Sequence, residues 1–283
     1  MRLSWTADEI RHKANELRIG ALDAIYEAGS GHPGGSLSAA DIIGCLYYNV
    51  MDVDPSRPAR PDRDRLVLSK GHSCPILYAA LADRGFFPRR WLMGLRKLGE
   101  PLQGHPDSIT TPGVDFSTGS LGQGLSAGLG MAMACKYMGN ENRIYVVLGD
   151  GDMQEGQTWE AASVAAHHGL DNLCAIFDSN GLQGEGAVHD IHDLRDIGEK
   201  FRQFGWEAAR LDGHDIDALL NAFSRAADTQ GKPFLIVAET VKGKGVSFME
   251  HEANWHGSRS PTLEQLELAK YELDRATYEM GEQ

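Results

Sequence analysis

The chain has 283 residues, a formal net charge of −13, 33 glycines and four cysteines. This length can bury a large core, and the acidic charge argues against a surface for nucleic acids or anionic membranes. The cysteines, Cys45, Cys74, Cys135 and Cys174, are far apart and form no CxxC pair, so we expect neither a disulfide framework nor a zinc site. The sequence also has no leader-like start and no apolar run of membrane-spanning length, so we expect a cytoplasmic protein with reduced thiols.

Histidines that follow glycine mark three loops in the first part of the chain. Thr6 and Glu9 form a capping box that predicts a helix over 7–27. An irregular turn rich in glycine then carries His32, and a further helix is expected over 38–50. A single histidine in such a turn is more often a plain turn residue than a functional one.

His72 and His105 lie in similar loops. A short apolar strand over 65–69 precedes His72, and a helix over 75–84 follows it. A helical patch over 91–98 leads to the loop that holds His105. Three Gly-His elements in one chain exceed what the composition alone predicts. Further on, small residues recur at helical spacing over 122–134, which predicts a helix that a backbone or a ligand can approach closely.

The central part of the chain, residues 143–186, predicts a strand, a loop, a helix and a second strand. Apolar residues over 144–148 and 173–177 are typical of strands buried on both faces, and a helix is expected over 157–168. Such a crossover makes the two strands parallel. Asp150 and Asn180, which follow the two strands, are therefore expected at the same carboxyl edge of one sheet, where open α/β sheets bind ligands.

Asp150 and Asn180 offer the oxygen ligands that suit a hard cation. Mg²⁺ prefers octahedral oxygen coordination and is usually held by few protein ligands together with phosphates. Gly149 and Gly151 flank Asp150 and let the backbone approach a phosphate closely. A Gly-Asp-Gly triplet alone occurs in many turns, but its combination with an asparagine 29 residues later is much more specific. The pattern predicts a clamp for a metal and a diphosphate.

Strand and helix patterns alternate over the rest of the chain. Helices are expected over 193–204 and 215–227 and strands over 206–211 and 233–239, followed by a long polar loop over 240–260 and a helix over 261–280. This alternation predicts an α/β fold, a doubly wound, mainly parallel sheet with helices on both faces. We expect one domain over 1–283.

The Gly-Asp-Gly triplet followed by about thirty residues and an asparagine resembles the thiamine diphosphate fingerprint. The motifs GHPGG, SKGHS, QGHP, TGSLGQG and WHG resemble transketolase in particular. The resemblance covers nearly the whole chain, but only the first domain of the usual long transketolase polypeptide, which binds the diphosphate and is called the PP domain. It implies the thiamine diphosphate-binding fold.

The resemblance implies a set of cofactor and metal contacts. Asp150, the side chain of Asn180 and the carbonyl of Leu182 would bind Mg²⁺, for which Ca²⁺ or Mn²⁺ can substitute, and Gly151 would donate its amide to the diphosphate. Further cofactor contacts would come from Gly119, Ser120 and Leu121, although many full-length relatives have proline in place of Ser120.

The resemblance also implies catalytic histidines. His72 and His256 would reach the diphosphate and the reacting centre, and His32 and His105 would lie near the hydroxyls of the donor sugar. Histidine titrates near neutral pH, which suits proton transfer to and from sugar hydroxyls. The other histidines that do not end a helix, His12, His189, His192, His214 and His251, are expected in loops or at the surface.

Two pairs of charged residues have open roles. Glu155 and Glu160 match two acidic residues that lie at the interface between cofactor sites in the family, but both also fit helix amino-terminal carboxylates stabilised by the helix dipole. Lys242 and Lys244 could neutralise a phosphate, but we expect a solvated pair.

In the family, the glutamate that activates thiamine and the residues that grip the sugar phosphate belong to a second, pyrimidine-binding domain. The pyrimidine-binding and C-terminal domains are therefore expected on a partner chain, so that this chain resembles the amino-terminal subunit of a split transketolase in an α2β2 assembly. Alternatives are a subunit of another thiamine enzyme, similar to a deoxyxylulose-phosphate synthase or a 2-oxoacid dehydrogenase E1 α-subunit, or a non-catalytic cofactor-binding subunit. The complete histidine set argues against the last.

Overall fold

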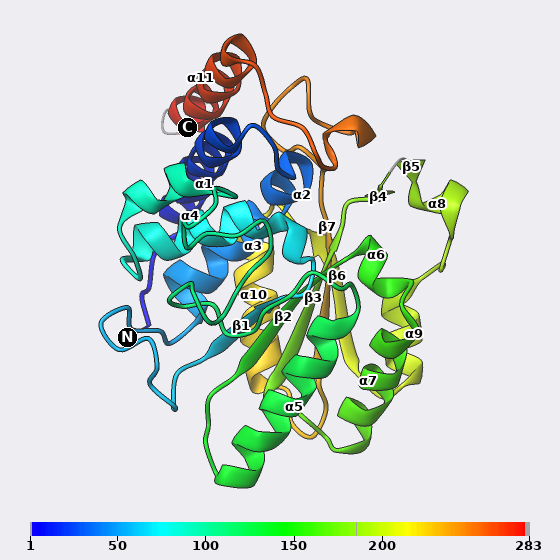
Figure 1. Ribbon diagram of the computed structural model, residues 1–283. Coiled ribbons are helices and arrows are strands. Elements are labelled where there is room, and N and C mark those ends of the chain that lie inside the picture. Colours follow the sequence, from blue (N-terminus) through cyan, green and yellow to red (C-terminus); the bar gives the residue numbers. More distant parts are fainter. Residues whose placement is uncertain (1, 185, 281–283) are drawn as a thin grey trace.

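A five-stranded parallel sheet forms the centre of the computed structural model, which describes residues 2–184 and 186–280 (Figure 1). The strand order is β1-β2-β3-β7-β6 and every neighbouring pair is parallel. The bounds of the strands are Arg65–Leu68 for β1, Ile144–Gly149 for β2, Leu173–Ser179 for β3, Glu207–Asp212 for β6 and Phe234–Glu239 for β7. The predicted α/β fold with a mainly parallel sheet is confirmed.

Helices cover both faces of this sheet because alternate strand residues point to opposite sides. In β2, Tyr145 and Val147 pack into one apolar layer, whereas Ile144, Val146 and Leu148 pack into the other. The first layer includes residues of α1 (Ala7–Ala28), α3 (Ala40–Cys45), α4 (Cys74–Arg84) and α10 (Ile216–Asp228). The second includes α5 (Gln123–Met138), α7 (Gly156–His167) and α9 (Ile197–Gln203).

Small residues allow α5 to lie close to the sheet. A Cβ atom at Gly128 would overlap the Val146 side chain, and one at Gly124 would overlap Ser69. The predicted close approach is therefore that of α5 to the strands. It brings the amino-terminal end of α5 near the carboxyl edge of the sheet.

The amino-terminal helices differ from the prediction in one place. Helix α1 begins at the predicted capping box, where Glu9 N donates to Thr6 Oγ1 at 3.3 Å. The predicted helix over 38–50 is instead three pieces, which are α2 (Pro33–Ser38), α3 and a π-turn over Leu46–Val50. The first piece starts early because proline suits the first turn of a helix, so the helix begins directly after His32.

Several short elements were not predicted, because they have too few residues to show a period. They are 3₁₀ turns over Gly71–Ser73 and Ala253–Trp255, a helical turn α6 (Asp150–Met153), a hairpin of β4 (Leu182–Gln183) and β5 (Gly186–Ala187), and α8 (Val188–Ile191). The helical patch predicted over 91–98 is a 3₁₀ turn over Arg89–Gly94. Helix α9 starts four residues later than predicted, since Asp196 caps it by accepting from Glu199 N at 2.9 Å.

The long loop over 240–260 is packed against the body of the protein. Val246, Met249 and Trp255 form a third apolar cluster with Leu22 of α1, Leu37 of α2 and three residues of α11 (Leu263–Met280). The loop therefore has a defined course over the carboxyl edge of the sheet. Among the described residues, no helix combines the length and apolar character needed to cross a bilayer.

Candidate active site

Asp150 and Asn180 lie at the same edge of the sheet, as predicted. Gly149, the last residue of β2, is in register with Asp178 of β3, so the residues that follow the two strands emerge side by side. Asp150 is 7 % exposed and begins the short helix α6. Asn180 Oδ1 accepts a hydrogen bond from Leu182 N at 3.1 Å.

The carboxylate of Asp150 lacks a partner on one oxygen. Its Oδ2 atom is buried and has no hydrogen-bond partner in the part of the chain that the structure describes. Burial and the nearby Asp178 raise the pKa of Asp150 to about 7, although Lys70 and the backbone amide of Asn180 act in the opposite direction. A buried carboxylate oxygen in this setting suits a cation.

The available donors fit a hard cation held together with a phosphate ligand. The described part of the chain contains no group of three or more His, Cys, Asp or Glu side chains that could hold a metal. A metal at Asp150 would therefore need the neutral oxygens of Asn180 and Leu182 and further oxygens from a ligand, which is the arrangement that Mg²⁺ prefers with phosphates.

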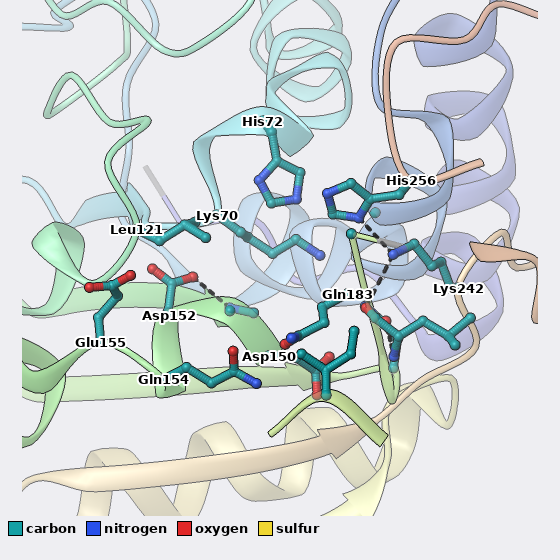
Figure 2. A pocket seen from close by; sticks show the side chains of 17 residues that line it. Lys70, His72, Leu121, Asp150, Asp152, Gln154, Glu155, Gln183, Lys242 and His256 are labelled. Atoms are coloured by element: carbon teal, nitrogen blue, oxygen red, sulfur yellow. Dashed lines mark hydrogen bonds between the residues drawn. The ribbon is translucent and has the colours of Figure 1, made fainter. Parts of the chain in front are cut away.

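A cavity of about 310 Å³ lies beside Asp150 (Figure 2). It is bordered by the ends of several strands, and in Figure 2 the amines of Lys70 and Lys242 lie between Asp150 and two histidines. Its polar lining residues include Lys70, His72, Asp150, Asp152, Gln154, Glu155, Asn180, Gln183, Lys242 and His256.

Lys70 is a buried cation with a buried carboxylate as its partner. It follows β1, is 1 % exposed and pairs with Asp178, which is fully buried in β3. Asp178 also accepts a hydrogen bond from Ser38 Oγ at 2.7 Å and one from Thr240. Burial alone would raise the pKa of Asp178, but Lys70 and these hydrogen bonds hold it below its usual value.

Lys242 is also buried, so the prediction that it forms a solvated pair with Lys244 is wrong. Lys242 is 2 % exposed, and its Nζ donates to Leu182 O at 3.1 Å and to His256 Nδ1 at 2.8 Å. Burial and the nearby Lys70 lower the pKa of Lys242 to about 8. Lys244 is partly exposed and lies 3.7 Å from Glu250.

A signal for both lysines is present in the sequence. Lys70 directly follows the strand pattern at 65–69, and Lys242 follows the one at 233–239. Residues just beyond buried parallel strands meet at one edge of the sheet, which is the reasoning that placed Asp150 correctly.

The four histidines predicted to be catalytic form one cluster. The ring centroid of His32 lies 5.1 Å from that of His72, 6.5 Å from that of His105 and 5.7 Å from that of His256. The rings of His72 and His256 are 5.1 Å apart. His72 and His256 line the cavity beside Asp150, and His32 and His256 line a second, adjoining hollow of about 570 Å³. His105 joins the cluster through His32.

These imidazoles are neutral at neutral pH. Burial, with help from nearby cations, lowers the pKa of His32 and of His256 to about 4. The pKa of His72 is well below its usual value and that of His105 is lowered, again chiefly through burial. Neutral imidazoles can both accept protons and donate hydrogen bonds.

The other predicted site residues divide between the cavity and its surroundings. Gly151, Leu121 and Glu155 line the cavity, and Gly119 packs against the ring of His105. Ser120 and Glu160 are exposed and do not line it. Glu155 is also the N-cap residue of α7, so both interpretations of this carboxylate remain compatible with its position.

Fold and site together define an α/β domain with a polar cavity, lined by lysines, acids and histidines, at the carboxyl ends of its strands. The family model described as "Transketolase, thiamine diphosphate binding domain" matches residues 10–276. The chain therefore belongs to this transketolase family.

Two similar proteins are named as transketolase subunits. The 6-deoxy-6-sulfo-D-fructose transketolase subunit SqwG of Clostridium sp. (strain MSTE9) is 44 % identical over 94 % of this chain and 97 % of its own length. A subunit of the apulose-4-phosphate transketolase of Phocaeicola vulgatus is 39 % identical over 94 % of this chain and 93 % of its own length.

Long transketolases match over only part of their length. Transketolase of Rattus norvegicus is 42 % identical over 89 % of this chain, which spans 40 % of that protein. A crystal structure of a transketolase mutant from Pichia stipitis superimposes with a TM-score of 0.89 at 30 % identity, covering 93 % of this chain and 40 % of that one.

Proposed function

We propose that this chain is the amino-terminal subunit of a split transketolase. It would transfer a two-carbon ketol unit from a ketose phosphate to an aldose phosphate together with a C-terminal partner subunit. The observation that carries the proposal is a cluster of four neutral histidines, two of which, His72 and His256, line the cavity beside Asp150. Among the described residues, Asp150 Oδ2 has no partner. Similarity to two proteins named as subunits, over nearly their whole length, supports the two-chain arrangement.

The donor set suits thiamine diphosphate held through a divalent metal. Asp150, Asn180 and the carbonyl of Leu182 would bind Mg²⁺, with Ca²⁺ or Mn²⁺ as substitutes, while the amines of Lys70 and Lys242 would offset the charge of the diphosphate. When bound, thiamine diphosphate supplies the stabilisation of negative charge on carbon that carbon–carbon bond cleavage requires. The chain itself anchors the group and handles protons.

His256 has a defined protonation pattern. Because the Lys242 amine donates to Nδ1 at 2.8 Å, Nδ1 carries no proton and Nε2 carries the ring proton. The Nε2–H group is then a hydrogen-bond donor for a sugar oxygen. His32 lines the adjoining hollow, where its ring can meet a ligand hydroxyl. Together these rings can hold a sugar and exchange protons with its hydroxyls.

The donor sugar is proposed to carry a terminal anionic group. The two relatives named as subunits are named for a sulfo sugar and for a sugar phosphate. Sugar phosphates are therefore the proposed substrates, and the residues that select among them are expected on the partner. The four cysteines are free thiols, which fits the proposed cytoplasmic location.

The chain alone is expected to show no ketol transfer, and the C-terminal subunit should restore it. The reason is that the glutamate expected to activate thiamine belongs to the partner, proposed to complete an α2β2 assembly. The measurement is a coupled transfer assay with the purified chain, Mg²⁺ and thiamine diphosphate, with and without the partner. Robust turnover by the chain alone would contradict the split site.

Replacing His32 or His105 with alanine is expected to lower kcat about 100-fold or more, as for loss of a general acid–base group. Cofactor affinity should change little, because neither ring lines the cavity beside Asp150. The matched control is His168→Ala, since His168 is exposed at the end of α7. Unchanged turnover in both variants would favour the non-catalytic, cofactor-binding alternative.

A further inference from the structure

His214, which was expected in a loop or at the surface, lies in the turn after β6 and is only partly exposed. Its side chain is 13 % exposed. Asp212 accepts from His214 N at 2.8 Å, and Gly213 N donates to Glu239 O at 2.7 Å. A Cβ atom at Gly213 would lie 2.5 Å from Thr240 Cγ2, so only glycine lets this turn pack against the end of β7.

Both ring nitrogens of His214 have partners. Nδ1 lies 2.7 Å from Asp41 Oδ2, and Nε2 accepts a hydrogen bond from Val241 N at 2.8 Å. Since Nε2 accepts, it carries no proton. The ring proton is therefore on Nδ1 and is donated to Asp41, which defines a single tautomer.

Asp41 is a fixed acceptor for this proton. Arg18 and Asp41 are each 3 % exposed and form an ion pair of 2.5 Å, while Arg18 Nε also donates to Leu37 O at 3.1 Å. Burial would raise the pKa of Asp41, but Arg18 and the hydrogen bond from His214 hold it well below its usual range. The carboxylate stays ionised and anchors His214 to α1 and α3.

The other end of this chain of contacts reaches the cavity. Val241 precedes Lys242, whose amine contacts Leu182 O and His256 Nδ1. Two further hydrogen bonds hold the backbone on the far side of Val241, from Gly243 N to Gly34 O and from His251 N to Lys242 O, both at 3.0 Å. On the near side, where the chain leaves β7, Thr240 N donates to Ser179 O at 3.1 Å and Val241 N donates to His214 Nε2 at 2.8 Å.

We propose that His214 is a positioning residue of the active site. As its Nδ1–H tautomer, it links the buried Asp41–Arg18 pair to the Val241 amide. This link fixes the backbone from which Lys242 reaches into the cavity. The contribution of His214 to cofactor binding rests on the proposed function, whereas its link between Asp41 and Val241 does not. His214 touches neither the cavity nor a bound group, so it acts only through Val241 and Lys242.

Hydrogen exchange of the full chain without cofactor tests the link. In His214→Phe, the Val241 amide loses its acceptor, so exchange over 240–250 should be about tenfold faster or more. Exchange in β3 should be unchanged. Leu219→Ala is the control, because Leu219 is a fully buried residue of α10 whose truncation lowers stability without touching Val241. His214→Gln, whose amide oxygen can accept from Val241, should restore part of the protection.

The tautomer gives a second measurement that needs no variant. Nitrogen NMR of the wild-type chain should show a protonated Nδ1 and an unprotonated Nε2 for His214. The opposite tautomer would overturn the proposal, as would unchanged exchange over 240–250 in His214→Phe. Equal loss of protection in Leu219→Ala would also overturn it, because the effect would then be a general loss of stability.

Calorimetric titration of the assembled complex with thiamine diphosphate and Mg²⁺ tests whether His214 contributes to cofactor binding. His214→Phe should weaken binding about tenfold, His214→Gln less, and Leu219→Ala not at all. Wild-type binding with no difference in His214→Phe would overturn the role of His214 alone. A wild-type complex that binds no cofactor would overturn the proposed function and, with it, this role.

Discussion

Replacing Asp150 with asparagine is expected to weaken metal-dependent binding of thiamine diphosphate by about 100-fold or more, through loss of the charged ligand that we propose for the metal. The same change should leave the folded chain as stable as the wild type or more stable. Burial and the neighbouring Asp178 disfavour an ionised Asp150, and its Oδ2 has no partner to lose. Such opposite effects on binding and stability are typical of a residue that binds a ligand at a cost in protein stability.

Asp152→Asn provides the matched control two residues away. Asp152 is fully buried and accepts hydrogen bonds from Gly122 N and Gly149 N, both at 2.8 Å, and from Ser69 Oγ. This substitution should lower the free energy of unfolding by about 1–3 kcal/mol. Urea unfolding of both variants and calorimetry with the partner present are the measurements. Equal destabilisation by the two changes, or full cofactor binding by Asp150→Asn, would contradict the assignment.

Replacing Lys70 with methionine is expected to lower the free energy of unfolding by about 3–5 kcal/mol at pH 7, because Asp178 would remain as an unpaired charge in the core. Methionine keeps most of the volume of the lysine stem, so packing alone should contribute little. The penalty should shrink as the pH falls, since Asp178 without Lys70 can take up a proton.

The double variant Lys70→Met with Asp178→Asn separates charge from packing. Removing both charges should recover most of the lost stability, because no buried charge is then left without a partner. Urea unfolding at pH 7 and at about pH 5 measures both effects. A double variant as unstable as Lys70→Met alone would show that the hydrogen bonds to Asp178, rather than its charge, dominate.

The parts of the site that could be predicted depend on local patterns. The apolar residues over 144–148 and 173–177 predict two buried strands. The single helical connection between them makes these strands parallel. Asp150 and Asn180 could therefore be placed at one edge without knowledge of the rest of the sheet. The histidine cluster was accessible only through the resemblance, because nothing in the spacing of Gly-His loops brings His32 near His256.

The parts that could not be predicted depend on strand order and on packing between distant segments. Strand β7 pairs with β3, and β6 lies outside it, an order that the sequence pattern does not determine. Without it, Lys242 after β7 cannot be placed beside Leu182. The burial of His214 is equally non-local, because its partners Asp41 and Val241 are 173 and 27 residues away.

The neutral state of the clustered imidazoles makes this protein sensitive to mild acid. His32 and His256 hold protons only below about pH 4 when folded, against 6.5 as their ordinary pKa. Between these values the unfolded chain binds protons that the folded chain excludes, so the free energy of unfolding decreases as the pH falls through this window. Acidification would thus destabilise the fold through the same rings that we propose for proton transfer.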